Sequence, residues 1–264
     1  MEKMQDIMDV ARANAFLSAL GRDEVLKTGD PLPPFFHQLY FWQVMPPEKL
    51  GRDGHPKTGL GLIPDMGLPR RMWAGGRLSF KHPIQAGMHA ERRTVLEAAT
   101  QKNGRTDPVG FVTLRDELFQ SDRLCLTEWQ DLVYREDPDP AAFKPVPPKA
   151  RTDETIARVH AFSSTLLFRY SALTFNGHKI HYDRDYARQV EGYDSLVVHG
   201  PLLAQYLMLL ATEHVGPIGS FSFRAVSPLM DFETAGFCLN GSELWVRGAD
   251  GRTCMTASFK TKET

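Results

Sequence analysis

The chain has 264 residues, and its 31 Lys and Arg against 32 Asp and Glu give a formal net charge of −1 at pH 7. This balance argues against a nucleic-acid binder, which usually carries a basic patch, and the 16 Phe, 7 Tyr and 4 Trp exclude a disordered chain. The longest apolar stretch, Leu202–Ala211, is interrupted by Gln205 and is shorter than the roughly 18 residues of a membrane-spanning helix. We therefore expect a folded protein with neither a nucleic-acid nor a membrane partner.

The N-terminal segment and the cysteines predict a cytoplasmic location. Residues 1–9 carry acidic side chains early and lack the apolar core of a secretory signal. The three cysteines, Cys125, Cys238 and Cys254, are odd in number and scattered through segments that resemble strands. Such a pattern favours buried free thiols in a reducing compartment over disulfides.

Two segments of similar design occur in the two halves of the chain. In the first half R-L-S-F-K-H-P-I precedes a turn at Asn103-Gly104-Arg105-Thr106 and the segment G-F-V-T-L. In the second half S-F-S-F-R-A-V-S-P-L precedes Asp250-Gly251-Arg252-Thr253 and M-T-A-S-F. Asn-Gly and Asp-Gly suit the positive backbone dihedrals of tight hairpin turns. The matching hairpins favour an internal duplication over coincidence.

A proline-rich segment, Asp137–Asp153, separates the halves. Its five prolines exclude a continuous helix or a central strand and indicate a semi-rigid, extended linker. We therefore divide the chain into an N-terminal unit at 1–136, a linker at 137–153 and a C-terminal unit at 154–264.

The strongest helix prediction covers Pro201–Thr212, with the sequence P-L-L-A-Q-Y-L-M-L-L-A-T. Proline suits the first helical turn, and the residues that follow favour helix. Apolar side chains occur on nearly every side of this helix, so it must be buried all round. We expect the downstream strands, Gly219–Met230, Thr234–Asn240 and Glu243–Lys262, to wrap around it as a curled sheet.

Polar side chains that could take part in catalysis are concentrated just before this helix. Asn176, His178 and His181 fall at the end of an expected helix and in the loop after it, where Gly177 is expected to make the turn. Together they could hold and activate a water molecule. His199 and Gly200 then open the buried helix, whose free N–H groups could stabilise a carbonyl oxygen that becomes negatively charged.

Two other interpretations of these residues remain open. Each histidine taken singly is more often a structural residue than a chemical one, and the polar side chains could simply cap the helices. His178 and His181 are three residues apart and could share a zinc ion, but a zinc site needs a third ligand and the cysteines are scattered. We expect no metal.

The string T-F-N-G-H-K-I-H-Y-D, followed by H-G-P, resembles the motif of the MaoC-like (type 2) enoyl-thioester hydratases, S-G-D-x-N-P-x-H-x-D with a later H-G pair. In this resemblance His181 matches the motif histidine, Asp183 the following acid and Gly200 the glycine that donates its N–H to the thioester oxygen. The family has the hot-dog fold, an antiparallel sheet around one long helix. The resemblance therefore implies an α+β double hot-dog in which only the second repeat retains the motif.

The resemblance extends to Leu50–Phe80, which contains G-R-D-G-H-P-K-T-G and L-P-R-R-M-W-A-G-G. These segments are similar to the branch with itaconyl-CoA and mesaconyl-CoA hydratases and the mitochondrial hydroxyacyl-thioester dehydratases. One position departs from the general motif, because the aspartate five residues before the histidine is Asn176 here. An asparagine can orient a water but cannot accept its proton, so His181 would have to act as the general base.

The implied function is reversible hydration of an enoyl-CoA, with His181, Asn176 and Gly200 as the catalytic group and with His178 and His199 beside the substrate. Itaconyl-CoA or mesaconyl-CoA would bring a free carboxylate, which requires a buried cation. Arg70 and Arg71 are the candidates, with Trp73 as a possible pocket wall. Either arginine could instead contact a CoA phosphate or form a surface ion pair, and Phe35–Trp42 could line an acyl tunnel or belong to the core.

The partner implied is an acyl-CoA thioester, with CoA as part of the substrate and with no cofactor. A homodimer is expected, because hot-dog proteins commonly pair their sheets. Three alternatives remain: a 3-hydroxyacyl-thioester dehydratase of the fatty-acid type, a hot-dog thioesterase and a non-catalytic acyl-CoA-binding protein.

Overall fold

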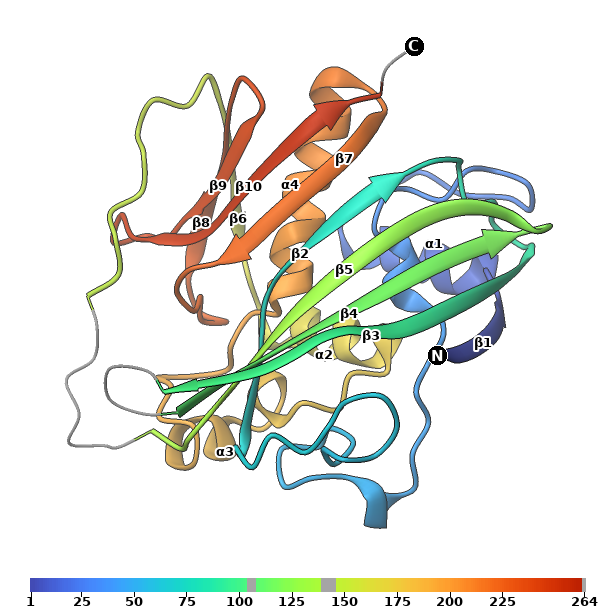
Figure 1. Cartoon of the computed structure of the whole chain (residues 1–264). Helices are drawn as coiled ribbons and strands as arrows, with labels where there is room; N and C mark the ends of the chain where they lie inside the picture. The colour runs from blue at the N-terminus through green and yellow to red at the C-terminus, as the bar shows by residue number, and fades with distance from the viewer. Residues whose placement is uncertain (104–107, 139–145, 263–264) are drawn as a thin grey trace.

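The strands form one ten-stranded antiparallel sheet. The computed structural model describes residues 1–103, 108–138 and 146–262, and its sheet has the order β1-β3-β4-β5-β2-β7-β10-β9-β8-β6 (Figure 1). The strands of the first half are β1 Glu2–Ile7, β2 Arg70–Phe80, β3 His89–Asn103, β4 Pro108–Gln120 and β5 Arg123–Arg135. Those of the second half are β6 Ile156–Ala161, β7 Ile218–Ala225, β8 Thr234–Asn240, β9 Glu243–Arg247 and β10 Thr253–Thr261.

The two halves of the sheet repeat one topology. Each contributes five strands, and the order 1-3-4-5-2 of the first half becomes 6-8-9-10-7 in the second, read inward from its own edge. The halves meet where β2 pairs antiparallel with β7, with Gly76 opposite Phe223. This arrangement confirms the double hot-dog prediction. The proposed unit boundaries at 136 and 154 stay a prediction, and residues 139–145 of the expected linker lie outside the described residues.

Helix α4, Gly200–Val215, is the central helix of the second repeat. It packs against β7, β8, β9 and β10 and also touches β2. Its leucines are nearly inaccessible, and even Gln205 is 1% exposed because its amide donates to the carbonyl oxygen of Pro34 at 3.0 Å. The predicted buried helix is therefore confirmed, with one turn more at its C-terminal end.

The other helices of the described residues are shorter than α4. In the first repeat α1, Val10–Ala19, begins at Asp9, whose carboxylate accepts the N–H of Ala11. It packs against α2, Ser164–Thr174. The remaining helices are α3 Arg184–Gln189 and the 3-10 helices η1 Phe36–Leu39, η2 Pro47–Lys49 and η3 Lys179–His181.

The strand predictions need one correction, whereas the predicted hairpin turn at Gly251 is confirmed. The expected strand at Gly219–Met230 ends at Ala225, because Val226 and Ser227 turn back to donate their N–H groups to the carbonyl oxygen of Cys254. The segment Glu243–Lys262 is a hairpin of β9 and β10 around Gly251, which has φ +82° as a tight turn requires. The matching turn at Gly104 lies outside the described residues, although β3 and β4 pair up to Asn103 and Pro108.

The glycines after Trp73 allow the two repeats to approach closely. A Cβ added at Gly75 would lie 2.5 Å from the carbonyl oxygen of Phe223, and one at Gly76 would lie 2.7 Å from its ring. The pairing of β2 with β5 shifts register between Trp73 and Gly75. This bulge places Trp73 beside the first residue of α4, so the β2–β7 junction between the repeats lies next to the start of that helix.

Three further expectations can be compared with the structure. All three cysteines are free and buried, as predicted. No helix in the described part of the chain is long and apolar enough to cross a membrane. Of the aromatic segment Phe35–Trp42, Phe35, Phe36 and Phe41 belong to the main hydrophobic core.

Candidate active site

A cavity of about 930 Å³ lies at the junction of the two repeats, and a neighbouring one of about 580 Å³ adjoins it. His55, Arg71 and Asn176 line both, so the two volumes meet at these residues. Such dimensions suit a small-molecule ligand. Most residues singled out from the sequence line the larger cavity: Arg71, Trp73, Asn176, His178, His181 and Gly200.

His181 is held firmly in η3 at the wall of this cavity. Its Nδ1 lies 2.7 Å from the carbonyl oxygen of Val197. Because a carbonyl oxygen can only accept, Nδ1 carries the proton and Nε2 keeps its lone pair. Burial lowers the pKa of His181 to about 3, against the smaller raising effect of the Val197 hydrogen bond. The imidazole is therefore neutral at pH 7 and can accept a proton at Nε2.

His199 supports His181 from behind. The two rings stack with centroids 3.6 Å apart, and His199 Nε2 lies 2.8 Å from the hydroxyl oxygen of Ser171. The His199 side chain is 0% exposed and its Nδ1 has no hydrogen-bond partner within the described residues. The sequence predicted that His199 binds the substrate. In the structure its ring is buried and stacked on His181, so we assign it the role of positioning His181.

The turn after α2 differs from the expectation. Phe175, not Gly177, adopts the left-handed conformation, with φ +53°, and its ring stacks on Trp42 at 4.9 Å. Gly177 is needed for another reason: a Cβ there would lie 2.8 Å from the carbonyl oxygen of Gly54. The loop after α2 is thus pressed against a loop of the first repeat.

Asn176 and His178 lie within this compact loop. The Asn176 side-chain oxygen accepts the backbone N–H of His178 at 3.0 Å, which fixes the amide at the cavity wall. The His178 ring contacts His181 edge-on, with centroids 5.4 Å apart. Burial lowers the pKa of His178 well below its ordinary value, so this ring is also neutral. Asp183, the last acid of the motif, caps α3 by accepting the N–H of Tyr186 at 3.0 Å.

Gly200 is the first residue of α4, and its backbone N–H has no carbonyl one turn earlier in the helix. The start of the helix is fixed because Val197 and Val198 donate their N–H groups to the carbonyl oxygens of Ile180 and Leu229. A Cβ at Gly200 would lie 3.1 Å from the Trp73 ring. Glycine therefore lets an oxygen atom approach this N–H beside the indole, at the positive end of the helix dipole.

The two arginines of β2 have different environments. Arg70 Nε donates to a carboxylate oxygen of Glu191 at 2.6 Å, and both side chains are largely buried. Arg71 lines both cavities, and among the described residues no carboxylate lies within 4.0 Å of its guanidinium. Arg71 is therefore the cation available to a ligand, whereas Arg70 is engaged by the protein.

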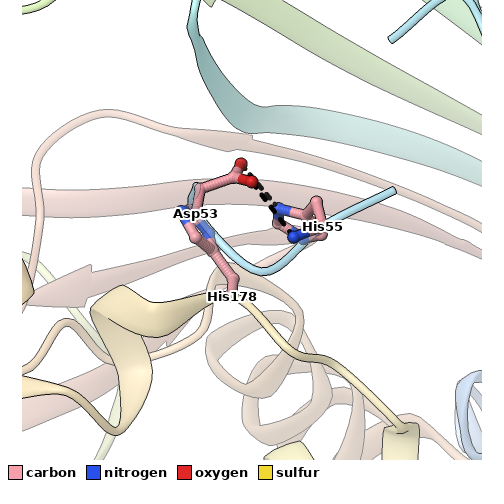
Figure 2. A group of neighbouring side chains, drawn as sticks. All are labelled: Asp53, His55 and His178. Carbon is pink, nitrogen blue, oxygen red and sulfur yellow. Dashed lines mark hydrogen bonds and ion pairs between the residues drawn. The ribbon is translucent and has the colours of Figure 1, made fainter. Parts of the chain in front are cut away.

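Two polar residues of the cavity region were not singled out from the sequence. Asp53 and His55 belong to G-R-D-G-H-P, and Figure 2 shows them facing each other beside His178. His55 Nδ1 lies 3.2 Å from Asp53 Oδ2, and the His55 and His178 ring centroids are 4.4 Å apart. The signal was present, because an Asp and a His two residues apart next to glycine suit a tight polar loop, but nothing in the sequence placed this loop at the second repeat.

Asp53, His55 and His178 are also the one group of potential metal donors found within the described residues, with donor atoms within 4.8 Å of one another. The Asp53 and His55 donor atoms already face each other in a hydrogen bond, which a metal ion would have to replace. The positive charge of Arg71 acts on both residues and would oppose a cation. The hydrogen-bonded arrangement therefore accounts for the group, and the absence of a metal stays a prediction.

The buried histidines make stability dependent on pH. The pKa values of His178, His181 and His199 are all lowered by burial, so in acid the unfolded chain binds protons that the folded chain does not. Stability is therefore complete above the unfolded value of about 6.5 and falls as pH decreases below it. As the pH falls from about 6.5 to about 5, each of these buried histidines therefore contributes a loss of stability.

Urea unfolding at the two pH values measures this loss. His199→Gln should reduce the pH dependence, whereas the same change at the exposed His214 should have a smaller effect. Equal stability of the wild type at both pH values would show that these imidazoles are protonated in the folded state.

A double hot-dog sheet, a free N–H at the start of the buried helix and a neutral, oriented histidine meet in one cavity, which is the arrangement expected of a hydro-lyase that acts on thioesters. Such a helix N-terminus can hold a thioester oxygen, and such a histidine can accept a proton.

Comparisons with known proteins agree with this class. The family model for hydroxyacyl-thioester dehydratase type 2 matches residues 35–231. The chain is 44% identical to the mesaconyl-C(4)-CoA hydratase of Chloroflexus aurantiacus over 98% of this chain and 94% of that protein. It is 26% identical to the mitochondrial hydroxyacyl-thioester dehydratase type 2 of Schizosaccharomyces pombe over 81% of this chain and 80% of that protein.

A solved Mycobacterium tuberculosis protein with a double hot-dog fold superposes with a TM-score of 0.60 at 14% identity, over 98% of this chain and 94% of that one. The chain belongs to the hydroxyacyl-thioester dehydratase type 2 family. It is an enzyme of the hydratase and dehydratase class, as the resemblance of its motif implied.

Proposed function

We propose that the protein adds water reversibly to the double bond of a C-five dicarboxylic enoyl-CoA, with mesaconyl-CoA as the first candidate and itaconyl-CoA as the second. The observation that carries this proposal is the placement of Arg71, a cation without a carboxylate partner within 4.0 Å among the described residues, in the cavity that also holds His181 and Gly200. The name of the Chloroflexus relative supports the choice of mesaconyl-CoA.

The proposed reaction uses the thioester to acidify the α-carbon. The oxygen of the thioester accepts the N–H of Gly200 and becomes enolate-like as the water oxygen bonds to the β-carbon. His181 Nε2 accepts a proton and returns one to the α-carbon, and the electron pair of the enolate forms the new C–H bond. Asn176 orients the water through its amide. No cofactor is required in this scheme.

The free carboxylate of the substrate is assigned to Arg71. Arg71→Ala should lower kcat/KM for mesaconyl-CoA far more than for crotonyl-CoA, which lacks that carboxylate. A charge-assisted bond of roughly 1.5–3 kcal/mol corresponds to a selective loss in kcat/KM of about ten- to a hundredfold. Arg77→Ala on the exposed side of the same strand is the matched control and should change neither value. Equal losses on both substrates would instead assign Arg71 to a CoA phosphate.

The opposite direction, dehydration of a 3-hydroxyacyl thioester, is the second candidate, because the family and the Schizosaccharomyces relative carry that name. Both directions use the same groups. A long acyl chain would need open space beyond the β-carbon, and the smaller cavity, lined by Tyr40, Phe41 and Trp42, offers a place for it.

One assay tests the function. The protein is mixed with mesaconyl-CoA and with crotonyl-CoA, and both the enoyl absorbance and the free thiol are followed. Loss of absorbance without thiol is the expected result. Release of thiol would indicate a thioesterase, and no change with either substrate would indicate a protein that only binds acyl-CoA. The homodimer and the cytoplasmic location stay predictions.

A further inference from the structure

Hydration requires two proton transfers, and the motif as this chain carries it has one proton acceptor. A proton must leave the water that attacks the β-carbon, and a proton must reach the α-carbon. Asn176 stands where the general motif has an aspartate, and an amide accepts no proton at neutral pH. Within the cavity the structure places another candidate next to Asn176, namely His55.

The Asp53–His55 pair has the geometry of an oriented base. Asp53 Oδ2 lies 3.2 Å from His55 Nδ1, and Asp53 Oδ1 accepts the backbone N–H of His55 at 3.1 Å. A carboxylate can only accept, so Nδ1 carries the proton and Nε2 keeps its lone pair. The Asp53 side chain is 12% exposed and that of His55 is 19% exposed, so the pair is shielded yet reachable from the cavity.

The loop that carries this pair is fixed to the second repeat. The carbonyl oxygen of Asp53 accepts the N–H of Lys179 at 2.8 Å. Gly54 and Gly177 are in such close backbone contact that a Cβ on Gly54 would overlap the Gly177 carbonyl. His55 and Asn176 line the same two cavities. The pair therefore reaches the position of the missing aspartate from the other half of the chain.

The positions of the histidine rings indicate which carbon of the substrate His181 and His55 would each serve. His181 stacks on His199, the residue before Gly200, so it lies at the end of the cavity where the thioester oxygen binds. His55 contacts His178, which in turn contacts His181, with ring centroids 4.4 Å and 5.4 Å apart. The β-carbon of an enoyl thioester is one bond farther from the carbonyl than the α-carbon.

We propose that His55, oriented by Asp53, is the second proton-transfer residue of the reaction and serves the β-carbon, whereas His181 serves the α-carbon. The inference rests on the proposed hydratase function and refines it. His55 Nε2 takes a proton from water as the water oxygen bonds to the β-carbon, and the π electrons move toward the thioester oxygen. The proton then passes from His55 through solvent to Nε2 of His181, which is neutral at the start of the turnover. His181 gives this proton to the α-carbon, so both histidines are neutral again at the end of the cycle.

The charged and titratable groups facing His55 are Asp53 on its own loop, Arg71 on β2, and His178 and His181 after α2. Burial and Arg71 lower the pKa of His55, and the Asp53 hydrogen bond opposes them. Removing the carboxylate charge should therefore lower that pKa further. For a base that acts in its neutral form, the acidic limb of the kcat profile then moves to lower pH.

Three variants test the proposal with mesaconyl-CoA and crotonyl-CoA. His55→Gln should lower kcat by about 10²–10⁴-fold with little change in KM. Asp53→Asn keeps the backbone contacts but turns an N–H toward His55 Nδ1, which favours the wrong tautomer. It should lower kcat by more than about tenfold and shift the acidic limb. His82→Gln is the matched control, a histidine of the first half that is hydrogen-bonded to Arg123 outside the cavity, and should be unchanged.

The outcomes separate this inference from the function it rests on. If the wild type hydrates neither substrate, the proposed function fails. If the wild type is active and His55→Gln keeps kcat within about threefold, or raises KM alone, the inference fails. Loss of wild-type activity on chelation, with metal bound in the purified protein, would also overturn it in favour of a metal site. If His55→Gln does not fold, the pH profile of Asp53→Asn decides.

Discussion

Replacing His181 with alanine is expected to lower the turnover number for enoyl-CoA hydration by at least ~100-fold, because the cavity loses the proton-transfer group nearest the thioester. Steady-state kinetics with crotonyl-CoA measures the loss, and binding of CoA should be nearly unchanged. His181→Gln is the more conservative variant, since its amide can still donate to the Val197 carbonyl oxygen that now accepts Nδ1–H. It should be as inactive as the alanine variant.

The control is His214→Ala, an exposed histidine near the end of α4, which should keep full activity. Near-normal hydration by either His181 variant would contradict the proposed mechanism. His178 would then be the next residue to replace, because its ring lies 5.4 Å from that of His181 and lines the same cavity.

Removing the backbone N–H of Gly200 is expected to reduce kcat by about 10²–10³-fold, the usual cost of losing one oxyanion donor. Gly200→Pro removes this N–H, and the neighbouring His199 already has the extended conformation that a following proline requires, with φ −58° and ψ 128°. Proline is tolerated in the first turn of a helix, so α4 should still form.

Gly200→Ala is the matched variant, because it adds a Cβ against Trp73 but keeps the N–H. The difference in kcat between the proline and alanine variants isolates the N–H from the steric effect on the indole, which lies 3.1 Å from the added atom. Thermal unfolding of both variants reports on the helix. Equal kcat values for the two would show that the thioester oxygen binds elsewhere.

The parts of the fold that depend on local pattern were predictable. The all-round apolar surface of Pro201–Thr212 required a buried helix, and the Asp250-Gly251 turn marked the last hairpin. The motif placed His181 and Gly200 at one site because their spacing is fixed by the loop and helix between them. The structure brings both to the larger cavity.

What could not be predicted depends on contacts between distant segments. Asp53 and His55 meet His178 across more than a hundred residues of chain, and only the docking of two loops at Gly54 and Gly177 brings them together. The same holds for Arg70, whose ion pair with Glu191 joins β2 to the loop after α3. Sequence spacing carries no information about such pairs.

The turn at Phe175 was mispredicted for a related reason. Glycine is the usual residue in the left-handed conformation, so Gly177 was the natural choice for the turn. The stacking of Phe175 on Trp42, from the other repeat, stabilises the less usual residue. Gly177 is instead required because a Cβ at this position would be too close to the carbonyl oxygen of Gly54.

The central claim is that water adds to the carbon–carbon double bond while the thioester stays intact. Incubation with mesaconyl-CoA in water labelled with oxygen-18, followed by mass spectrometry, tests it most directly. The predicted product is an acyl-CoA that carries one labelled oxygen in its new hydroxyl group, formed by the wild type and lost with His181→Ala. Label found only in a released free acid, together with free CoA, would contradict the claim, because water would then have attacked the thioester carbonyl.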